Sequence, residues 1–255
     1  MLFINTRPAD RAAALSESLK AAHIDVLDLP LLELSAEPWS EMLAAQYAQL
    51  ASVQMIVVVS PSAVQFGMKG LQKAGLSLAS LQHVKWIAVG EATAQALLQY
   101  DLHSEVPEVE TSEGMLRLPV LQQLPSSASV AFWRGEGGRQ FMMDCLLEQG
   151  NTVLNFVLYR RHCPSLTKQI LQRHLPQLNG LAVFTVLISS EASWNYWLDL
   201  LADHEPLLNR AVILVLGERV DALVEQYRVQ HHLSFTAVML HDMKINTILK
   251  QLEAV

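Results

Sequence analysis

The sequence predicts an α/β protein built on parallel sheets. Short, almost wholly apolar runs alternate along the chain with segments of helical periodicity. Strands buried on both faces of a parallel sheet are apolar throughout, rather than alternating in polarity. The pattern also repeats at a constant offset, which indicates two copies of one strand–helix unit.

The expected elements follow one another in the order strand, helix, strand. Nine runs are expected strands: Leu2–Thr6, Ile24–Pro30, Met55–Val59, Val84–Val89, Ser129–Trp133, Thr152–Tyr159, Leu181–Ile188, Ala211–Leu216 and Ser234–Val238. The helical segments between them carry apolar residues three and four positions apart, as in Ala9–Ala22, Glu91–Tyr100, Gly137–Gln149 and Glu218–Arg228.

The internal repeat has an offset of 127 residues (134 − 7 = 127). Its matched positions run from the start of the chain almost to its end: Arg7 with Arg134, Leu19 with Leu146, Val26 with Val153, Leu31 with Leu158, Gly90-Glu91 with Gly217-Glu218, and Gln99-Tyr100 with Gln226-Tyr227. We interpret the repeat as two copies of an α/β unit. A tandem division near Ser127 and one continuous sheet of about ten strands are both compatible with this pattern.

Composition excludes several classes of protein. The chain has 255 residues, of which 51% are hydrophobic and 17% charged, so it has enough apolar material for large cores. Its net charge of −7, without a basic run, argues against a nucleic-acid partner. Cys145 and Cys163 match no metal-binding spacing, so no metal is expected. The N-terminus does not resemble a signal peptide and no apolar run could span a membrane, which predicts a cytoplasmic protein.

Candidate ligand contacts lie in the turns that follow the strands, because parallel sheets bind ligands beyond the carboxyl ends of their strands. Six such turns carry small, hydroxyl or arginine side chains: Thr6-Arg7-Pro8, Ser60-Pro61-Ser62, Gly90-Glu91-Ala92-Thr93, Arg134–Arg139, Ser189-Ser190-Glu191 and Gly217-Glu218-Arg219. Free N–H groups at helix starts favour anions. The alternative for the serines is ordinary helix capping.

Arg134-Gly135-Glu136-Gly137-Gly138-Arg139 is the most suggestive of these turns. Glycines expose backbone N–H groups, and forked arginine donors suit carboxylates. The segment matches neither a dinucleotide fingerprint nor a P-loop. A structural turn with two solvated arginines is the alternative. Tyr159, which ends an expected strand, could present its hydroxyl at the same edge, or it could pack in the core.

Taken in order, these turns resemble the uroporphyrinogen-III synthase family. The matching segments are Thr6-Arg7-Pro8, Val58–Val64, Ala88–Ala94, Pro107 with Thr111–Leu116, Arg134–Arg139, Tyr159-Arg160-Arg161 and Leu216–Val220. The resemblance implies two doubly wound α/β domains joined by a two-strand linker. One would combine residues 1–36 with 166–255, and the other would be residues 37–165. Val220 stands where family members often have a hydroxyl residue.

The resemblance also implies an activity and a set of site residues. The expected reaction closes hydroxymethylbilane, which carries eight carboxylates, into a macrocycle with loss of water and inversion of ring D through a spiro intermediate. It needs no cofactor, because catalysis rests on proximity and orientation. A cleft between the domains would hold the substrate, with transient contact to neighbouring pathway enzymes. Tyr159 and Thr93 are the expected catalytic residues. The expected substrate-binding residues are Arg7, Ser60, Ser62, Gly90, Ser112, Arg134, Gly135, Gly138, Arg139, Ser189, Ser190 and Gly217.

Two other classes of function compete with this one. A two-domain protein could close on a small anionic molecule without chemistry. An enzyme that uses a nucleotide cofactor is disfavoured, because no strand–turn carries the glycine pattern that such a cofactor requires.

Overall fold

The computed structural model describes residues 1–253, which divide into two compact units. Unit 1 combines Met1–Glu33 with the chain from His162 onward, and unit 2 is Leu34–Arg161. The domain boundaries expected from the resemblance, after residue 36 and before residue 166, fall slightly beyond these two crossings.

Unit 1 is built on a five-stranded sheet of order β10-β9-β8-β1-β2, in which the described strand pairs are parallel. Its strands are β1 (Leu2–Asn5), β2 (Asp25–Asp28), β8 (Phe184–Ile188), β9 (Ala211–Leu216) and β10 (Thr236–Leu240). Its helices are α1 (Ala9–Ala21), α8 (Ser165–Gly180), α9 (Glu191–Leu200), α10 (Glu218–Gln230) and α11 (Ile245–Leu252). The strand order reverses between β1 and β8, as in a doubly wound sheet.

Unit 2 has a second five-stranded sheet, of order β3-β7-β6-β4-β5. Its strands are β3 (Glu33–Ala36), β4 (Met55–Val58), β5 (Lys85–Ala88), β6 (Ser129–Gly135) and β7 (Thr152–His162). Its helices are α2 (Glu41–Gln49), α3 (Pro61–Lys73), α4 (Glu91–Leu98), α5 (Ser112–Leu116), α6 (Pro119–Gln122) and α7 (Phe141–Glu148). β3 and β7 are hydrogen-bonded neighbours, and the chain crosses between the units at the first residues of β3 and the last residues of β7.

The sequence repeat corresponds to a structural repeat. Shifted by 127 residues, β1 coincides with β6, β2 with β7 and β9 with β5, while β8 overlaps β4. These pairs occupy the same places in the two sheets, β9-β8-β1-β2 and β5-β4-β6-β7. The expected fold class is confirmed, and the alternative of one continuous sheet is wrong. The copies are not tandem domains, because unit 1 takes two strands from the start of the chain and the rest from its last third.

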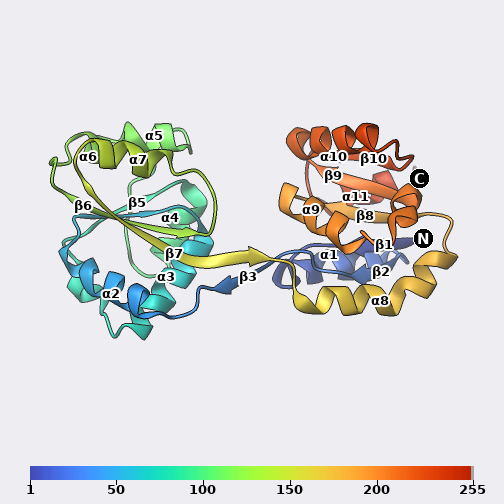
Figure 1. Ribbon diagram of the computed structural model, residues 1–255, viewed down its shortest axis with the longest axis horizontal. Helices are drawn as coiled ribbons and strands as arrows, with labels where there is room; N and C mark the ends of the chain where they lie inside the picture. Colours follow the sequence, from blue (N-terminus) through green and yellow to red (C-terminus); the bar gives the residue numbers. More distant parts are fainter. Residues whose placement is uncertain (254–255) are drawn as a thin grey trace. The chain divides into compact units, whose positions relative to one another are not determined.

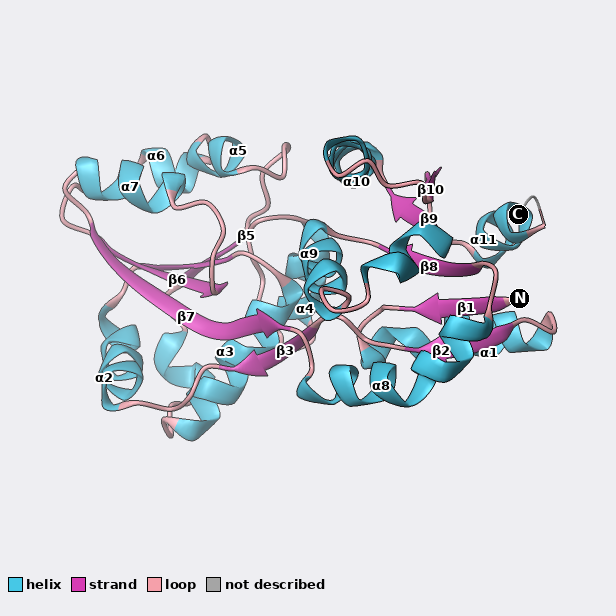
Figure 2. Ribbon diagram, turned by 45° about the vertical axis from the view of Figure 1, so that its right-hand side comes forward, coloured by secondary structure: helices cyan, strands magenta, loops and turns pink. Residues whose placement is uncertain are grey.

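Helices cover both faces of each sheet (Figures 1 and 2). In unit 2, α2, α3 and α4 pack on the face that carries Ile56 and Val58, and α5, α6 and α7 pack on the face that carries Met55 and Val57. Successive side chains of a strand point to opposite faces, so an apolar strand supplies both cores. In unit 1, α8, α9 and α10 cover one face and α1 and α11 the other.

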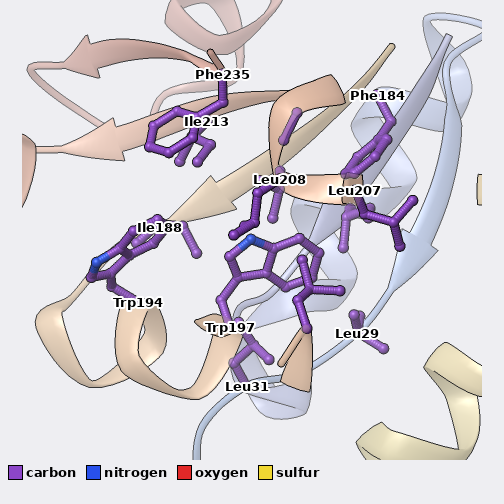
Figure 3. Close-up of a cluster of buried hydrophobic side chains, with 14 of the residues drawn as sticks. Leu29, Leu31, Phe184, Ile188, Trp194, Trp197, Leu207, Leu208, Ile213 and Phe235 are labelled. Carbon is purple, nitrogen blue, oxygen red and sulfur yellow. The ribbon is translucent and has the colours of Figure 1, made fainter. Parts of the chain in front are cut away.

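The tryptophans of α9 lie in the larger core of unit 1. Trp194 and Trp197 are almost completely buried, among side chains that include Leu207 and Phe235 (Figure 3). Both side chains therefore pack α9 against the sheet. Large aromatic side chains contribute strongly to such a core because each removes a large apolar area from water.

Several element boundaries differ from the sequence expectation. β7 continues three residues past Tyr159, to His162, beside β3, which is not among the nine strands expected from apolar runs but fits the two-strand linker that the resemblance implies. The expected helix from Gly137 begins only at Phe141, because Gly137 and Gly138 have φ values of +75° and +80°, which an α-helix does not accommodate. No helix in the described part of the chain is long and apolar enough to cross a membrane.

Candidate active site

A cavity of about 260 Å³ lies at the carboxyl ends of the strands of unit 2, beside the switch point between β4 and β6. It brings together seven of the predicted site residues: Ser60, Ser112, Arg134, Gly135, Gly138, Arg139 and Tyr159. These residues come from four separate stretches of the chain. Three arginines line it, the third being Arg161, and its lining includes no Asp or Glu among the described residues. Such a cavity favours an anionic ligand.

Tyr159 is buried within β7 and is not the last residue of that strand. Its side chain is only 1% exposed, and its ring stacks on Phe66 with 5.2 Å between centroids. The prediction that Tyr159 ends its strand is wrong, because pairing with β3 continues β7 beyond it. Its hydroxyl nevertheless reaches Ser60 Oγ at 2.9 Å and accepts a hydrogen bond from Arg161 Nη2 at 3.4 Å. The phenol therefore contacts both a hydroxyl and a cation at the cavity.

Ser60 has two roles at once. It is the N-cap of α3, where its Oγ accepts a hydrogen bond from the N–H of Ala63 at 3.0 Å, and Pro61 follows at the first helical position. The same Oγ is bonded to the hydroxyl of Tyr159. The capping alternative and the site prediction thus both describe this serine.

Gly135 is required by the ring of Tyr159. A Cβ atom at Gly135 would lie 2.5 Å from two ring carbons of Tyr159, closer than real Cβ contacts allow. The pairing register of β6 and β7 also shifts between Arg134 and Gly135. The glycine therefore lets the aromatic ring lie directly against the neighbouring strand.

Arg134 is not a solvated arginine. It is 6% exposed, and its guanidinium donates to the carbonyls of Gly135 (3.3 Å), Gly137 and Gly138 (3.2 Å). Burial lowers the pKa of Arg134 below its ordinary value. Arg134→Ala is therefore expected to lower the melting temperature, because this change would remove the hydrogen bonds that tie the exposed glycine turn to a buried side chain.

Arg139 lies at the other end of the turn and is exposed. It forms an ion pair with Glu113 of α5, with 2.5 Å between Nη2 and Oε1. This hydrogen bond is the main cause that lowers the pKa of Glu113. Ser112 is the neighbouring residue, so the ion pair connects the glycine turn to a second segment of the cavity lining.

The apolar wall of the cavity was not predicted from the sequence. It consists of Val59, Val89, Met115, Phe132, Met142 and Met143. Met142 and Met143 belong to the apolar face of α7, a pattern that indicates core packing as readily as a ligand site. Arg161 was also missed as a site residue, although it follows the tyrosine in the motif that carries the resemblance.

Three predicted residues of unit 2 do not line this cavity: Ser62, Gly90 and Thr93. Thr93 is 2% exposed and lies in α4, which packs with α3 on the sheet face that carries Ile56 and Val58. Beside Gly90, the exposed carboxylate of Glu110 accepts a hydrogen bond through Oε1 from the N–H of Glu91 at 2.8 Å. A Cβ atom at Gly90 would collide with that carboxylate.

The remaining predicted residues lie at the equivalent strand ends of unit 1. Arg7 follows β1, Ser189 and Ser190 follow β8, and Gly217 follows β9. Ser190 forms a capping box with Ser193 at the start of α9, as the capping alternative expects. Gly217 has a φ of +80°, a conformation that favours glycine.

Within residues 1–253, no three His, Cys, Asp or Glu side chains lie together in a way that could hold a metal ion. The cavity instead offers arginines, hydroxyls and turn amides, which are groups that bind carboxylates.

Comparison with known proteins gives concordant matches. The family model described as "Uroporphyrinogen-III synthase HemD" matches residues 13–236. The uroporphyrinogen-III synthases of Salmonella typhimurium and Escherichia coli are each 29% identical, over 168 and 171 residues, which is 63% of this chain. The match spans 65% of the length of each relative, slightly under two thirds.

Solved structures resemble the fold over its whole length. A mutant uroporphyrinogen III synthase from the extreme thermophile Thermus thermophilus aligns with a TM-score of 0.63 at 16% identity, covering 100% of this chain and 98% of that one. The enzyme described as uroporphyrinogen-III synthetase from Helicobacter pylori aligns with a TM-score of 0.58 at 14% identity, covering 99% and 98%. At these identities the likeness establishes the two-unit α/β fold.

Proposed function

Because the chain belongs to the uroporphyrinogen-III synthase family, we propose that it closes hydroxymethylbilane into uroporphyrinogen III, with inversion of ring D and loss of water. The observation that carries the proposal is a family match over residues 13–236, together with a cavity lined by three arginines at the strand ends of unit 2. The reaction is a dehydration with ring closure and is redox-neutral, so it requires no electron carrier.

The cavity suits part of this substrate rather than all of it. Pockets that enclose a drug-sized ligand usually measure roughly 300–1,000 Å³, and this cavity has about 260 Å³. One pyrrole ring with its acetate and propionate arms is the appropriate occupant. The ring would lie against the methionines and Phe132, and its carboxylates would be held by Arg139, Arg161 and turn amides.

Tyr159 is the proposed proton donor for the departing hydroxyl group. The hydroxyl of the hydroxymethyl group leaves more easily as water than as hydroxide, while its carbon stays on the pyrrole, so an acid at the cavity accelerates the first step. A phenol carries its proton at neutral pH. The cation of Arg161 donates to the phenol oxygen, an arrangement that stabilises negative charge developing there as the proton leaves.

Ser60 is the proposed group that exchanges a proton with the phenol of Tyr159. Its Oγ already accepts the N–H of Ala63, which fixes its position 2.9 Å from the phenol. After water has left, the same hydrogen bond can return a proton to the phenol when the pyrrole loses one on reclosure. Protons are then conserved over the cycle, and the tyrosine is restored.

The other predicted residues are proposed as contacts to further carboxylates. These are Arg7, Ser189, Ser190 and Gly217 in unit 1, and Ser62, Gly90 and Ser112 in unit 2. A substrate with eight carboxylates distributes its binding energy over many donors, so each single contact contributes about 1 kcal/mol. Thr93 is proposed as a second catalytic group that acts through a bound water.

The decisive experiment is an isomer assay on the unaltered chain. Purified protein is mixed with freshly prepared hydroxymethylbilane, and the products are oxidised and separated as the type I and type III isomers. The proposal expects type III as the main product, whereas closure without enzyme yields type I. A protein that binds the substrate but leaves the product as type I would be a binding protein, and the proposed activity would be wrong.

A further inference from the structure

The guanidinium of Arg134 makes its hydrogen bonds to the turn that follows its own strand. Nε donates to the carbonyl of Gly135, and Nη2 donates to the carbonyls of Gly137 and Gly138. Nη1 lies 3.8 Å from Met143 Sδ. With these contacts and only 6% exposure, little of the side chain is available to a ligand.

The hydrogen bonds from Arg134 to the carbonyls of Gly137 and Gly138 determine the direction of two backbone N–H groups. In a trans peptide the C=O and N–H groups point in opposite directions. Because the carbonyls of Gly137 and Gly138 face the guanidinium, the N–H groups of Gly138 and Arg139 are directed away from it. Neither of these N–H groups donates to a backbone carbonyl within residues 1–253.

Only glycine permits this turn at low cost. Gly137 and Gly138 have φ values of +75° and +80°, a region that other residues rarely adopt. Two successive glycines give the turn little conformational preference of its own, so contacts from outside the turn are needed to hold it in one conformation. Arg134 supplies that constraint from inside the unit.

We propose that Arg134 is a positioning residue, which acts through the Gly135–Arg139 turn to hold the N–H groups of Gly138 and Arg139 ready for a substrate carboxylate. This inference rests on the proposed function and replaces the direct carboxylate contact that the sequence suggested for Arg134. The carboxylate is bound by the two amides, with Arg139 beside it. The buried cation contributes the attractive field from behind the turn.

Three variants separate this role from a direct contact. Arg134→Met removes both charge and donors at similar length, and Arg134→Lys keeps the charge but cannot donate to several carbonyls at once. Arg117→Met, an exposed arginine of the same unit outside the cavity, is the matched control for loss of one charge. We expect Arg134→Met to raise KM for hydroxymethylbilane about ten- to hundredfold, the range for one charge-assisted contact, with a much smaller change in kcat. Arg134→Lys should not restore KM, and Arg117→Met should leave it unchanged.

A double-mutant cycle tests whether the effect passes through the turn. Gly138→Ala strains the turn directly, because its φ of +80° disfavours a side chain. If Arg134 acts through the turn, the increases in KM for Arg134→Met and Gly138→Ala are strongly non-additive. Full restoration of KM by Arg134→Lys, or an additive cycle, would show instead that Arg134 contributes charge directly to the ligand and would overturn the proposal.

A binding measurement without turnover keeps the test independent of the proposed activity and of stability. Uroporphyrin, the oxidised octacarboxylate macrocycle, is added at saturating concentration while hydrogen exchange is measured at Gly138 and Arg139. We expect at least about tenfold slower exchange at both amides in the unaltered protein, the counterpart of one charge-assisted contact, and no slowing in folded Arg134→Met. Protection at these amides together with a failed isomer assay would reject the activity but retain the positioning role. Unchanged exchange in the unaltered protein, despite bound uroporphyrin, would reject the positioning role itself.

Discussion

Replacing Tyr159 by Phe tests the chemical step most directly. The change removes only the phenol oxygen, which lies 2.9 Å from Ser60 Oγ and 3.4 Å from Arg161 Nη2. The ring would keep its stacking on Phe66 and its place against Gly135. Ser60 would still cap α3 through the N–H of Ala63. The folding cost should therefore be limited to these two hydrogen bonds, about 0.5–1.5 kcal/mol each.

The main kinetic effect is expected in kcat. Positioned acid catalysis typically contributes roughly 10²–10⁴-fold, so kcat for formation of the type III isomer should fall at least about tenfold, equivalent to about 1.4 kcal/mol in the barrier. KM should change little, because the arginines and turn amides remain. The assay is initial-rate formation of type III product from fresh hydroxymethylbilane, with thermal unfolding of the same samples.

Tyr47→Phe is the matched control for this prediction. Tyr47 is another buried tyrosine of unit 2, and its hydroxyl donates to the carbonyl of Gly67 at 3.2 Å, outside the cavity. Its loss should lower the melting temperature but leave kcat unchanged. A Tyr159→Phe protein with the turnover of the unaltered chain would refute the acid role and leave solvent water as the proton source.

Three further changes test the surroundings of the site. Gly135→Ala should reduce kcat at least about tenfold while the protein stays folded, because its Cβ would displace the ring of Tyr159, and small displacements of catalytic groups can cost up to about 10²-fold. Measurements of kcat and near-ultraviolet circular dichroism test this, and a normal kcat would contradict it. Arg139→Gln should raise the pKa of Glu113, which the ion pair holds below the ordinary value of 4.5. The stabilisation from this pair is complete above the ordinary pKa and is lost as pH falls through the lowered pKa. Titration of the Glu113 carboxyl by NMR tests this, and identical curves in both proteins would reject the interaction. Gly67→Ala should lower the free energy of unfolding by about 1–3 kcal/mol through overpacking, because its Cβ would collide with the ring of the buried Trp133. Denaturant unfolding measures this change, and unchanged stability would mean that α3 shifts freely.

Much of the fold could be predicted because strand burial and helix periodicity are local properties of a sequence. The offset of 127 residues also carried information about topology, since β1 with β6 and β2 with β7 proved to be equivalent strands. The turns after the strands were recognisable for the same local reason. The apolar pattern did not reveal β3, because a short exposed edge strand has no distinctive pattern and depends on its pairing with β7; only the family resemblance implied a two-strand linker.

The sequence by itself therefore determined the α/β class, the repeat and the set of residues at the strand ends. Only the tertiary structure decided what those residues do to one another. It buried Arg134 against three carbonyls of its own turn, paired Arg139 with Glu113, and joined the hydroxyls of Ser60 and Tyr159. These contacts join residues far apart in the chain or depend on the rotation of individual peptide units. Local propensity does not encode either, because both arise from the packing of strands and turns against one another.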